Sequence, residues 1–360
     1  MNRRVRIQDI AEELGLSTAT VSNVIHGKTK KISDETVKRV QELLEKRAYI
    51  PSMAGILLAQ NNSRIIGVVV NNHPKYEDNV LQDAFISSSM NALCREIESN
   101  GYFMMVKTTA DWNDIIPFAS MWNMEGLVLI GFCENDYHKL REKMHIPFVV
   151  YDGYFEEDSR ICNLFIDNYD GGRQMGEYLW RMGHRNVLCL ADNNICMDRD
   201  RIEGCKLGMK DGNVDFLQIP FRKDERSAFY ERCLDSMLAR YTAVFAVSDE
   251  YAIELLHFLQ RRGIPVPDKI SVAGFDNIPL CEKVYPELTT IGQDGMERAK
   301  CAISALKKLR DNEEVKPLQI LPARLIVRDS VKDIRNCSEM PHDKKLSPII
   351  SEQFLGERRR

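Results

Sequence analysis

Apolar positions near the start of the chain recur with the period of a helix. They fall at every third or fourth residue from Ile7 to Leu14, which predicts a short helix with one buried face that Gly15 ends. A second helix follows, with the Ser17 hydroxyl as its expected N-cap. Its inward positions are Val21, Val24 and Ile25, and its outward positions are the small or hydrogen-bonding Thr18, Ala19, Ser22 and Asn23. An outer face of this kind suits a DNA groove, which makes nucleic acid the first partner to consider.

A third helix is predicted to begin at Ser33. The hydroxyl of Ser33 can cap it, and two carboxylates follow at the positive end of the helix dipole, Asp34 and Glu35. Its apolar stripe closes a three-helix core: Val37, Val40, Leu43 and Leu44. The pattern therefore predicts a helix-turn-helix, and a small helical bundle with a solvated polar face is the alternative.

Beyond residue 60, strand-like and helix-like segments alternate, which is typical of parallel sheets wound with helices. We expect strands of a first lobe at 65–70, 103–106, 126–130 and 148–151, and strands of a second lobe at 186–190, 243–247 and 270–274. Helices such as 170–182 and 250–262 separate them. Ligands of this architecture bind at the carboxyl ends of the strands. The loops expected there carry Asp152, the cluster 198–201, Ser248-Asp249 and Asp276-Asn277.

Charge is distributed unevenly along the chain. Residues 1–60 hold ten Lys and Arg against seven Asp and Glu, a net charge of +3, whereas the other 300 residues carry a net charge of −7. A basic amino end on an acidic body fits a DNA-binding head joined to a body that does not itself bind DNA. Because affinity for DNA grows with the number of neutralised phosphates, a head of +3 is expected to act in pairs.

Cysteine usage and hydropathy point to the cytoplasm. The ten cysteines show no CxxC pairing and mostly lie among apolar residues, so we expect reduced structural thiols rather than disulfides or zinc ligands. No stretch approaches the roughly 18 apolar residues that span a membrane. The basic start MNRRVRIQD has no apolar run behind it, so no secretory signal is expected.

Seven motifs follow one another along the chain in a recognisable order. They are IQDIAEELGLSTATVSNVIHG, YIPS, IIGVVV, IDNYDGG, AVFAVSDEYAIELLHFLQRRGIPVPDKISVAGFDN, LTTIGQD and RLIVRDS. Together they resemble the LacI/GalR family of transcriptional regulators, which includes the lactose and purine repressors. The resemblance runs from about Ile7 to Val331. It implies an α/β fold with an N-terminal three-helix helix-turn-helix head, a hinge helix and a two-lobed, periplasmic-binding-protein-like body with parallel sheets.

The resemblance also implies a domain organisation. The head would occupy residues 1–50, the hinge helix or linker 51–61, and the effector-binding and dimerisation domain 62–331. Within that body, the first lobe would take about 62–163 and 292–322, and the second about 164–291 and 323–331. Residues 332–360 lack periodicity and are expected to form a disordered tail. The implied assembly is a homodimer on a near-palindromic operator, since the tail shows no tetramerising leucine heptad.

Residues of the second helix would then read DNA. The resemblance places three of them at base-reading positions, Thr18, Ala19 and Asn23, and two at phosphate contacts, Thr20 and Ser22. An Asn side chain can bond bidentately to adenine, and the methyl groups of Thr and Ala suit the thymine methyl. For Ala19, simple helix propensity accounts for the residue equally well.

In the hinge, Leu58 stands where family members push a leucine into the minor groove. This sequence departs from the common pattern beside it, with Gly55 in place of alanine and Ile56 in place of arginine. The glycine costs about 1 kcal/mol of helix stability, so the hinge is expected to be weaker or to be closed by apolar contact between subunits. A plain linker-anchoring role for Leu58 stays open.

The implied effector site lies between the lobes. The resemblance assigns to it Phe85, Asp152, Arg201, Ser248 and Asp276. Carboxylates accept bonds from vicinal hydroxyls and a guanidinium donates two parallel bonds, so a sugar or sugar derivative is the favoured ligand. Phe85 could stack on a sugar ring or belong to the core. Asp249 is expected to cap a helix beginning at Glu250, and the loop 71–83 is longer than in the lactose and purine repressors.

Other classes of protein fit the sequence less well. A phosphate-cradling GxxxxGK[ST] and an HExxH are both missing from the sequence, and Gly171-Gly172 lacks dinucleotide-binding spacing, so neither an enzyme nor a cofactor or metal is expected. Asp152 and Asp276 as a glycosidase pair would leave the head unexplained. The serious alternative is a soluble sugar-binding protein without a regulatory role, against which the basic head argues.

Overall fold

The computed structural model describes residues 5–49, 63–132, 137–154 and 161–335. In the head, three helices pack around one small core: α1 (Ile7–Leu14), α2 (Thr18–Ile25) and α3 (Asp34–Lys46). Gly15 adopts the left-handed φ of 66° that ends α1. Ser17 and Ser33 cap α2 and α3 by accepting hydrogen bonds from the backbone N–H groups of Thr20 and Thr36. The three predicted helices, their caps and the glycine stop are thereby confirmed.

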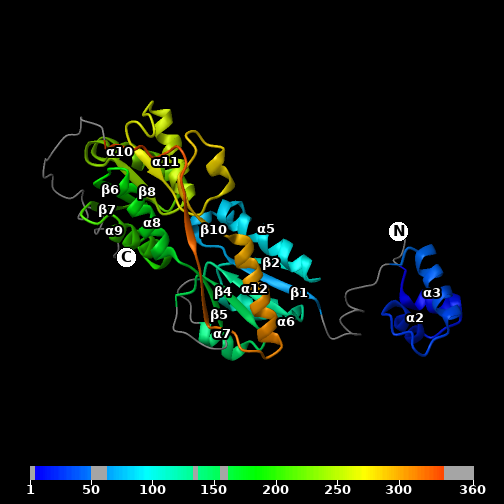
Figure 1. Ribbon diagram of the computed structural model, residues 1–360. Coiled ribbons are helices and arrows are strands. Elements are labelled where there is room, and N and C mark those ends of the chain that lie inside the picture. Colours follow the sequence, from blue (N-terminus) through cyan, green and yellow to red (C-terminus); the bar gives the residue numbers. More distant parts are fainter. Residues whose placement is uncertain (1–4, 50–62, 133–136, 155–160, 336–360) are drawn as a thin grey trace, which may run out of the picture.

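A six-stranded parallel sheet forms the centre of the first lobe, in the order β11-β5-β4-β3-β1-β2 (Figure 1). Its strands are β1 (Ile65–Asn71), β2 (Phe103–Thr109), β3 (Gly126–Ile130), β4 (Phe148–Tyr151), β5 (Cys162–Ile166) and β11 (Leu318–Leu321). Helices α5 (Ala84–Ser99) and α12 (Gly295–Arg310) cover one face, and α6 (Ile115–Met121) and α7 (Tyr137–Lys143) cover the other.

The central strand β1 shows why this sheet is buried on both sides. Ile66, Val68 and Val70 pack under α5 and α12, whereas Ile65 and Val69 pack under α6 and α7. Successive side chains of a strand point to opposite faces, so a strand covered on both faces needs a continuous apolar run. The sequence IIGVVV supplies that run.

The second lobe contains a four-stranded parallel sheet in the order β7-β6-β8-β9. Its strands are β6 (Asn186–Ala191), β7 (Asn213–Gln218), β8 (Ala243–Ala246) and β9 (Ser271–Ala273), and its helices are α8 (Asn168–Arg181), α9 (Cys196–Gly208), α10 (Lys223–Arg240) and α11 (Asp249–Arg261). Short helical turns η1 (Pro74–Tyr76), η2 (Val80–Gln82), η3 (Trp112–Asp114) and η4 (Pro279–Glu282) lie in the connections.

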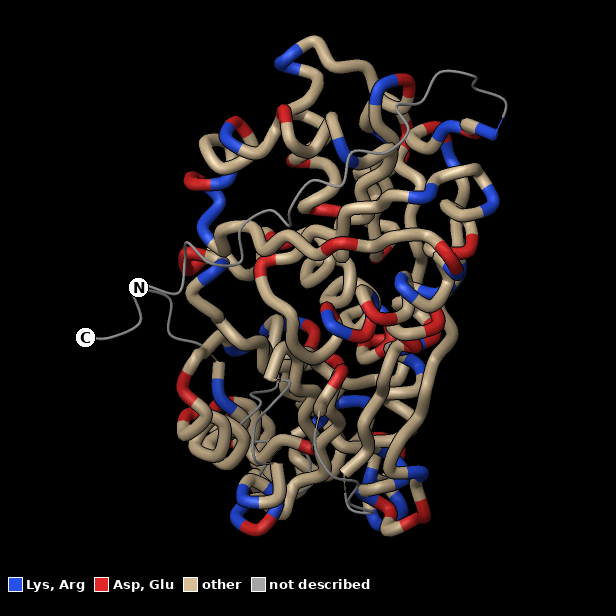
Figure 2. Tube along the Cα trace, turned by 90° about the vertical axis from the view of Figure 1, so that its left-hand side faces the viewer, with Lys and Arg blue, Asp and Glu red and all other residues tan. Residues whose placement is uncertain are grey.

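Figure 2 shows Lys and Arg residues interspersed with Asp and Glu residues along the described parts of the chain.

The chain passes between the two lobes three times. It crosses after β5 into α8, after β10 (Thr290–Gln293) into α12, and after β11 into β12 (Ala323–Ile326). β10 and β12 pair antiparallel with each other. The first crossing lies near Asp167, a few residues beyond the one that the resemblance implied. Each lobe is therefore assembled from segments far apart in the sequence.

Two helices of the second lobe touch through their backbones. Gly172 and Gly176 of α8 face α9, and Gly204 and Gly208 of α9 face α8. A Cβ at Gly172 would lie 2.1 Å from the carbonyl oxygen of Arg201, and one at Gly204 would lie 2.0 Å from that of Tyr169. No larger residue fits at these positions without moving a helix. Gly172 thus serves helix packing, whereas a Cβ at the neighbouring Gly171 would meet the Phe275 ring at 2.8 Å.

The expected strands and helices of the body are confirmed within a few residues at each end. Strands β5 and β7 and the crossing strands β10, β11 and β12 were not predicted from the sequence. All eight cysteines in the described ranges are free; five are buried, but Cys94 is exposed, which corrects its expected place among apolar residues. No described helix is long and apolar enough to cross a membrane. The hinge segment with Leu58 lies outside the described residues. Of the tail expected at 332–360, residues 332–335 are described and bond to the second lobe, with Ile334 donating its N–H to the carbonyl oxygen of Met182 at 2.8 Å, and the rest lies outside.

Candidate functional site

A cavity of about 470 Å³ lies between the carboxyl ends of the two sheets. All five side chains proposed from the sequence for this crevice line it: Phe85, Asp152, Arg201, Ser248 and Asp276. Phe85 lies in the first turn of α5 and Asp152 follows β4 in the first lobe, whereas Arg201 lies on α9, Ser248 follows β8 and Asp276 follows β9 in the second. The structure therefore brings the predicted residues of both lobes together around one space.

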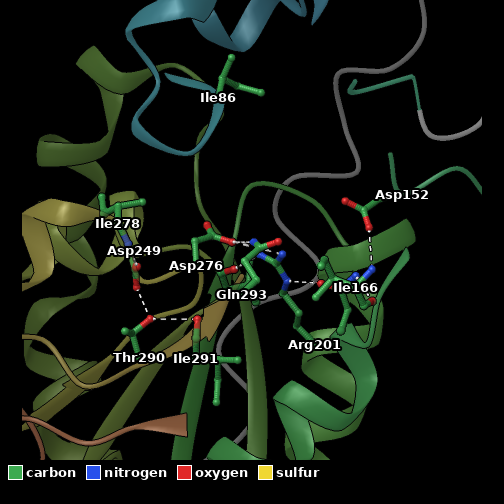
Figure 3. Close-up of polar contacts among 12 residues, drawn as sticks. Ile86, Asp152, Ile166, Arg201, Asp249, Asp276, Ile278, Thr290, Ile291 and Gln293 are labelled. Carbon is green, nitrogen blue, oxygen red and sulfur yellow. Dashed lines mark hydrogen bonds and ion pairs between the residues drawn. The ribbon is translucent and has the colours of Figure 1, made fainter. Parts of the chain in front are cut away.

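Arg201 is the most heavily bonded of them. Its side chain is only 5% exposed. Nε donates to Oδ1 of Asn168 at 2.8 Å, and Nη1 donates to the carbonyl oxygen of Val247 at 2.6 Å. Nη2 lies 3.3 Å from Oδ1 of Asp276 (Figure 3). The guanidinium carbon lies 3.7 Å from the centroid of the Phe275 ring. These contacts fix the guanidinium at the cavity wall.

Asp276 is held from two sides. Its Oδ1 accepts a hydrogen bond of 3.0 Å from Nε2 of Gln293 as well as facing Arg201 (Figure 3). Burial raises the pKa of this carboxyl well above its usual range, while the charge of Arg201 acts in the opposite direction. Asp276 has a φ of 120°, a value that non-glycine residues rarely adopt. The turn after β9 is thus strained in a way that aims a carboxyl at the cavity.

Asp152 does not present a free carboxylate. Its Oδ1 accepts a hydrogen bond of 3.1 Å from the backbone N–H of Ile166, and its Oδ2 lies 2.8 Å from Nη2 of Arg298. Arg298 lies on α12, is 2% exposed, and was not identified from the sequence. Both carboxylate oxygens are therefore engaged. Asp152 lines the cavity and also holds the guanidinium of Arg298 in place.

These contacts form a continuous chain between the lobes. Asn168, the first residue of α8, accepts a hydrogen bond from Arg201. Its Nδ2 donates a hydrogen bond of 2.9 Å to the carbonyl oxygen of Ile166. Ile166 in turn donates its N–H to Asp152. Two ion pairs and the hydrogen bonds between them therefore lead from Asp276 in the second lobe to Arg298 in the first, through the segment in which the chain crosses.

The expected cap of α11 was wrong by one residue. The helix begins at Asp249 rather than Glu250, and Ser248 occupies the N-cap position. The Asp249 side chain is fully buried and does not cap the helix. Its carboxylate instead accepts hydrogen bonds from the backbone N–H of Ile278 and from the hydroxyl of Thr290 (Figure 3). Asp249 therefore binds the turn after β9, which carries Asp276, to α11.

Phe85 has the core role that the sequence allowed, and it also lies at the wall of the cavity. It is partly buried and packs against the apolar cores of both lobes. An aromatic ring in this position contributes to the wall of the site and to the contact between the lobes.

The long loop 71–83 supplies residues that were missed. Its first turn, η1, directs Lys75 across the crevice to within 3.8 Å of Oδ2 of Asp192, which follows β6. Asp198 on α9 lies nearby: burial raises its pKa to about 6, while Lys75 and Arg201 act to lower it. Asp198 belongs to the cluster 198–201 expected at this end of the sheet, whereas Lys75 and Asp192 carry no local sequence signal, because only the fold brings η1 opposite the end of β6.

The outer face of α2 remains open. Thr18, Ala19 and Asn23 are exposed, and Thr20 and Ser22 are half-buried. The hydroxyl of Thr20 lies 2.9 Å from that of Ser17, so it takes part in the cap. Val21 and Val24 hold the opposite face in the core of the head. The exposed face has the width of one helix turn and lacks bulky side chains.

Two family models match this chain, one over the head and one over much of the body. A model described as bacterial regulatory proteins of the lacI family matches residues 6–52, and one described as a periplasmic binding protein-like domain matches residues 177–331. The HTH-type transcriptional repressor PurR of Vibrio vulnificus (strain CMCP6) is 30% identical over 346 residues, covering 91% of this chain and 99% of that protein. The chain belongs to the lacI family of bacterial regulatory proteins.

Solved structures agree on the fold of this lacI-family protein. The lac repressor dimer bound to operator and an anti-inducer has a TM-score of 0.77 at 21% identity, over 92% of this chain and all of that chain. The transcriptional regulator CelR in complex with cellobiose has a TM-score of 0.65 at 20% identity, over 91% of this chain and all of that chain. Family membership makes the protein a DNA-binding transcriptional regulator. It decides against the two alternative functions considered from the sequence, an enzyme and a sugar-binding protein without a regulatory role.

Proposed function

We propose that this lacI-family regulator is a homodimeric cytoplasmic repressor whose affinity for operator DNA is switched by a small carbohydrate bound between the lobes. The observation that carries the proposal is the convergence of Phe85, Arg201 and Asp276 from different lobes on one cavity of about 470 Å³. That volume lies in the range of small-molecule sites. The names of similar proteins support the ligand class, since CelR was solved with cellobiose.

The proposed switch uses the crossing segments. A ligand that bonds to Arg201 and Asp276 alters the partners of Asn168, and Asn168 is tied to the strand end at Ile166. The angle between the lobes changes as a result. In a dimer joined through the lobe nearest the head, such a change alters the spacing of the two heads. By linkage, operator DNA must change effector affinity by the same factor.

On DNA, we assign the recognition to α2. Thr18, Ala19 and Asn23 would contact base edges in the major groove, and Thr20 and Ser22 would contact phosphates. Leu58 would wedge the minor groove at the centre of the operator. Two heads on successive major grooves account for a palindromic site.

Selection of bound duplexes from a random DNA pool tests this function. The full-length protein is incubated with the pool at a stated salt concentration, and the bound fraction is sequenced. A palindromic consensus with a flexible central step is the expected result. The selected duplex then serves as the probe for sugars that change its affinity. A lack of enrichment both with and without a sugar mixture would contradict the proposal.

A further inference from the structure

Arg298 has unused hydrogen-bonding capacity deep inside the body. Its guanidinium is 2% exposed, and Nη2 donates to the carbonyl oxygen of Leu164 at 2.7 Å and faces Asp152 at 2.8 Å. Nε and Nη1 are buried and have no partner among the described residues. One N–H on Nε and two on Nη1 are therefore free to donate. Buried donors in native proteins are nearly always paired, so these three point to a binding role.

The hydroxyl of Tyr151 is in the same condition. It is buried and also lacks a partner among the described residues. The Arg298 guanidinium carbon lies 3.9 Å from the centroid of the Tyr151 ring. Burial raises the pKa of Tyr151, so its hydroxyl keeps its proton and can donate. Two side chains in contact with each other thus both carry unpaired donors.

A small cavity of about 80 Å³ adjoins these groups. Arg298, Tyr151, Ser89 and Gln293 line it, and Phe85, Tyr151 and Asp276 line both this cavity and the larger one. A ligand seated in the larger cavity can therefore extend one small substituent into the smaller. The volume suits a group of three or four heavy atoms and excludes a second sugar ring.

The groups around the small cavity favour a ligand group that accepts hydrogen bonds. Asp152 offsets the charge of Arg298, and Asp276 is already bound by Arg201 and Gln293. What remains is a set of N–H and O–H donors with a guanidinium among them. A carboxylate has two oxygens that can each accept more than one such bond, so it can satisfy these donors together, and its charge is opposite to that of the guanidinium.

We propose that the small cavity binds a carboxylate of the effector through Nε and Nη1 of Arg298 and the Tyr151 hydroxyl, so that the effector is a sugar acid. This inference rests on the proposed function for the carbohydrate part of the ligand. The carboxylate subsite itself follows from the residues of this chain alone. The two parts can be tested separately.

Acetate is the probe for the subsite. Thermal unfolding of the full-length protein is followed in sodium acetate and in sodium chloride of equal ionic strength. At an acetate concentration well above its dissociation constant, we expect the melting temperature to rise by about 2 °C over chloride. Arg298→Met should lose this difference, and Lys300→Met, which removes an exposed charge from the same helix, should keep it. No effect on the unaltered protein, or an equal effect in Arg298→Met, overturns the proposal.

Tyr151→Phe covers the case in which Arg298→Met fails to fold. It removes one unpaired hydroxyl and keeps the ring that packs against Arg298, so the fold should persist. We expect it to reduce the acetate effect, and an undiminished effect would contradict the assignment of the hydroxyl.

Matched sugars test the effector class. Calorimetric titration compares glucuronate with glucose and galacturonate with galactose. We expect at least one acid to bind about tenfold or more tightly than its neutral parent, and Arg298→Met to abolish that preference. Tighter binding of the neutral sugars overturns the proposal. If no sugar binds but acetate still acts through Arg298, the carbohydrate part of the proposed function fails and the carboxylate subsite stands.

Discussion

Nε of Arg201 donates a hydrogen bond of 2.8 Å to Oδ1 of Asn168, the first residue of α8 after the chain crosses from β5 into the second lobe. Asn168 is fully buried and passes the connection on to the carbonyl oxygen of Ile166. A cavity residue is thus bonded directly to a crossing segment. This contact gives the candidate ligand site a direct connection to the joint between the lobes.

Asn168→Ala should uncouple ligand from DNA. The substitution leaves Nε of Arg201 without its acceptor, which should lower the free energy of unfolding by about 1–3 kcal/mol. We expect operator affinity without effector to change little and the factor by which effector alters that affinity to fall several-fold. Operator titrations with and without effector measure this factor. Asn213→Ala, at an exposed strand end, is the control, and an unchanged factor in Asn168→Ala would exclude the contact from the switch.

Lys75→Met should weaken the contact between the lobes. The ion pair with Asp192 is 3.8 Å long, and the Lys75 side chain is 29% exposed, so its contribution should be about 1 kcal/mol or less. We expect effector affinity to fall by at most about fivefold and the loss to shrink at high salt. Calorimetry at two salt concentrations tests this. Lys308→Met, on an exposed face of α12, should show neither effect.

Asp198 should make stability depend on pH. Its pKa is raised to about 6 in the folded protein, mainly by burial, so the folded state holds the proton more tightly than the unfolded state. Stability from this group is therefore present at low pH and is lost as the pH rises from about 4 to about 6, by roughly 3 kcal/mol. Asp198→Asn cannot titrate and should lack this loss. Denaturant unfolding across that range compares the two proteins, and parallel pH profiles would contradict the assignment.

Asn23→Ala should lower the specificity of DNA binding. Asn23 is exposed on the outer face of α2, and a bidentate contact from it to adenine is worth about 1–3 kcal/mol of discrimination. We expect binding to the selected operator to weaken by at least about fivefold and binding to random DNA to stay nearly constant. Gel-shift titrations with both duplexes test this, with Gln41→Ala on the exposed face of α3 as control. Equal loss on both duplexes would make Asn23 a general contact.

Gly172→Ala should displace Arg201. The new Cβ would lie 2.1 Å from the Arg201 carbonyl oxygen, so α9 must move away from α8. We expect a loss of about 1–3 kcal/mol in stability and a marked loss of effector binding, with DNA binding by the head retained. Chemical unfolding and calorimetry measure the two effects. Arg181→Ala, at the exposed end of α8, should leave both unchanged.

The head could be predicted almost completely from sequence, because its signals are local. Ser17, Ser33 and Gly15 each act on the residues next to them, and their roles follow from the sequence alone. The strand β1 was equally clear, since a short, continuous run rich in β-branched residues is typical of a strand buried on both faces. The carboxyl-end rule also placed Asp152 and Asp276 at one cavity.

The missed features depend on distant partners. β7 has a half-exposed pattern with no clear period, and it is a strand because β6 pairs with it. Asp249 lies where a helix cap is expected, yet Thr290, 41 residues away, determines the direction of its carboxylate. In the sequence, Arg298 resembles any charged position on an amphipathic helix. Its burial follows only from the way α12 packs on the first sheet.

The three crossings between the lobes bear on the order in which the protein is made. All contacts of the three-helix core in the head join residues between Val5 and Tyr49, so that core can form as soon as this segment leaves the ribosome. The body cannot close so early, because β11 and β12 lie beyond residue 317 and pair with β5 and β10. A nascent chain can thus form the three-helix head before the two lobes and the cavity between them are complete. The two parts of the protein become available for folding in that order.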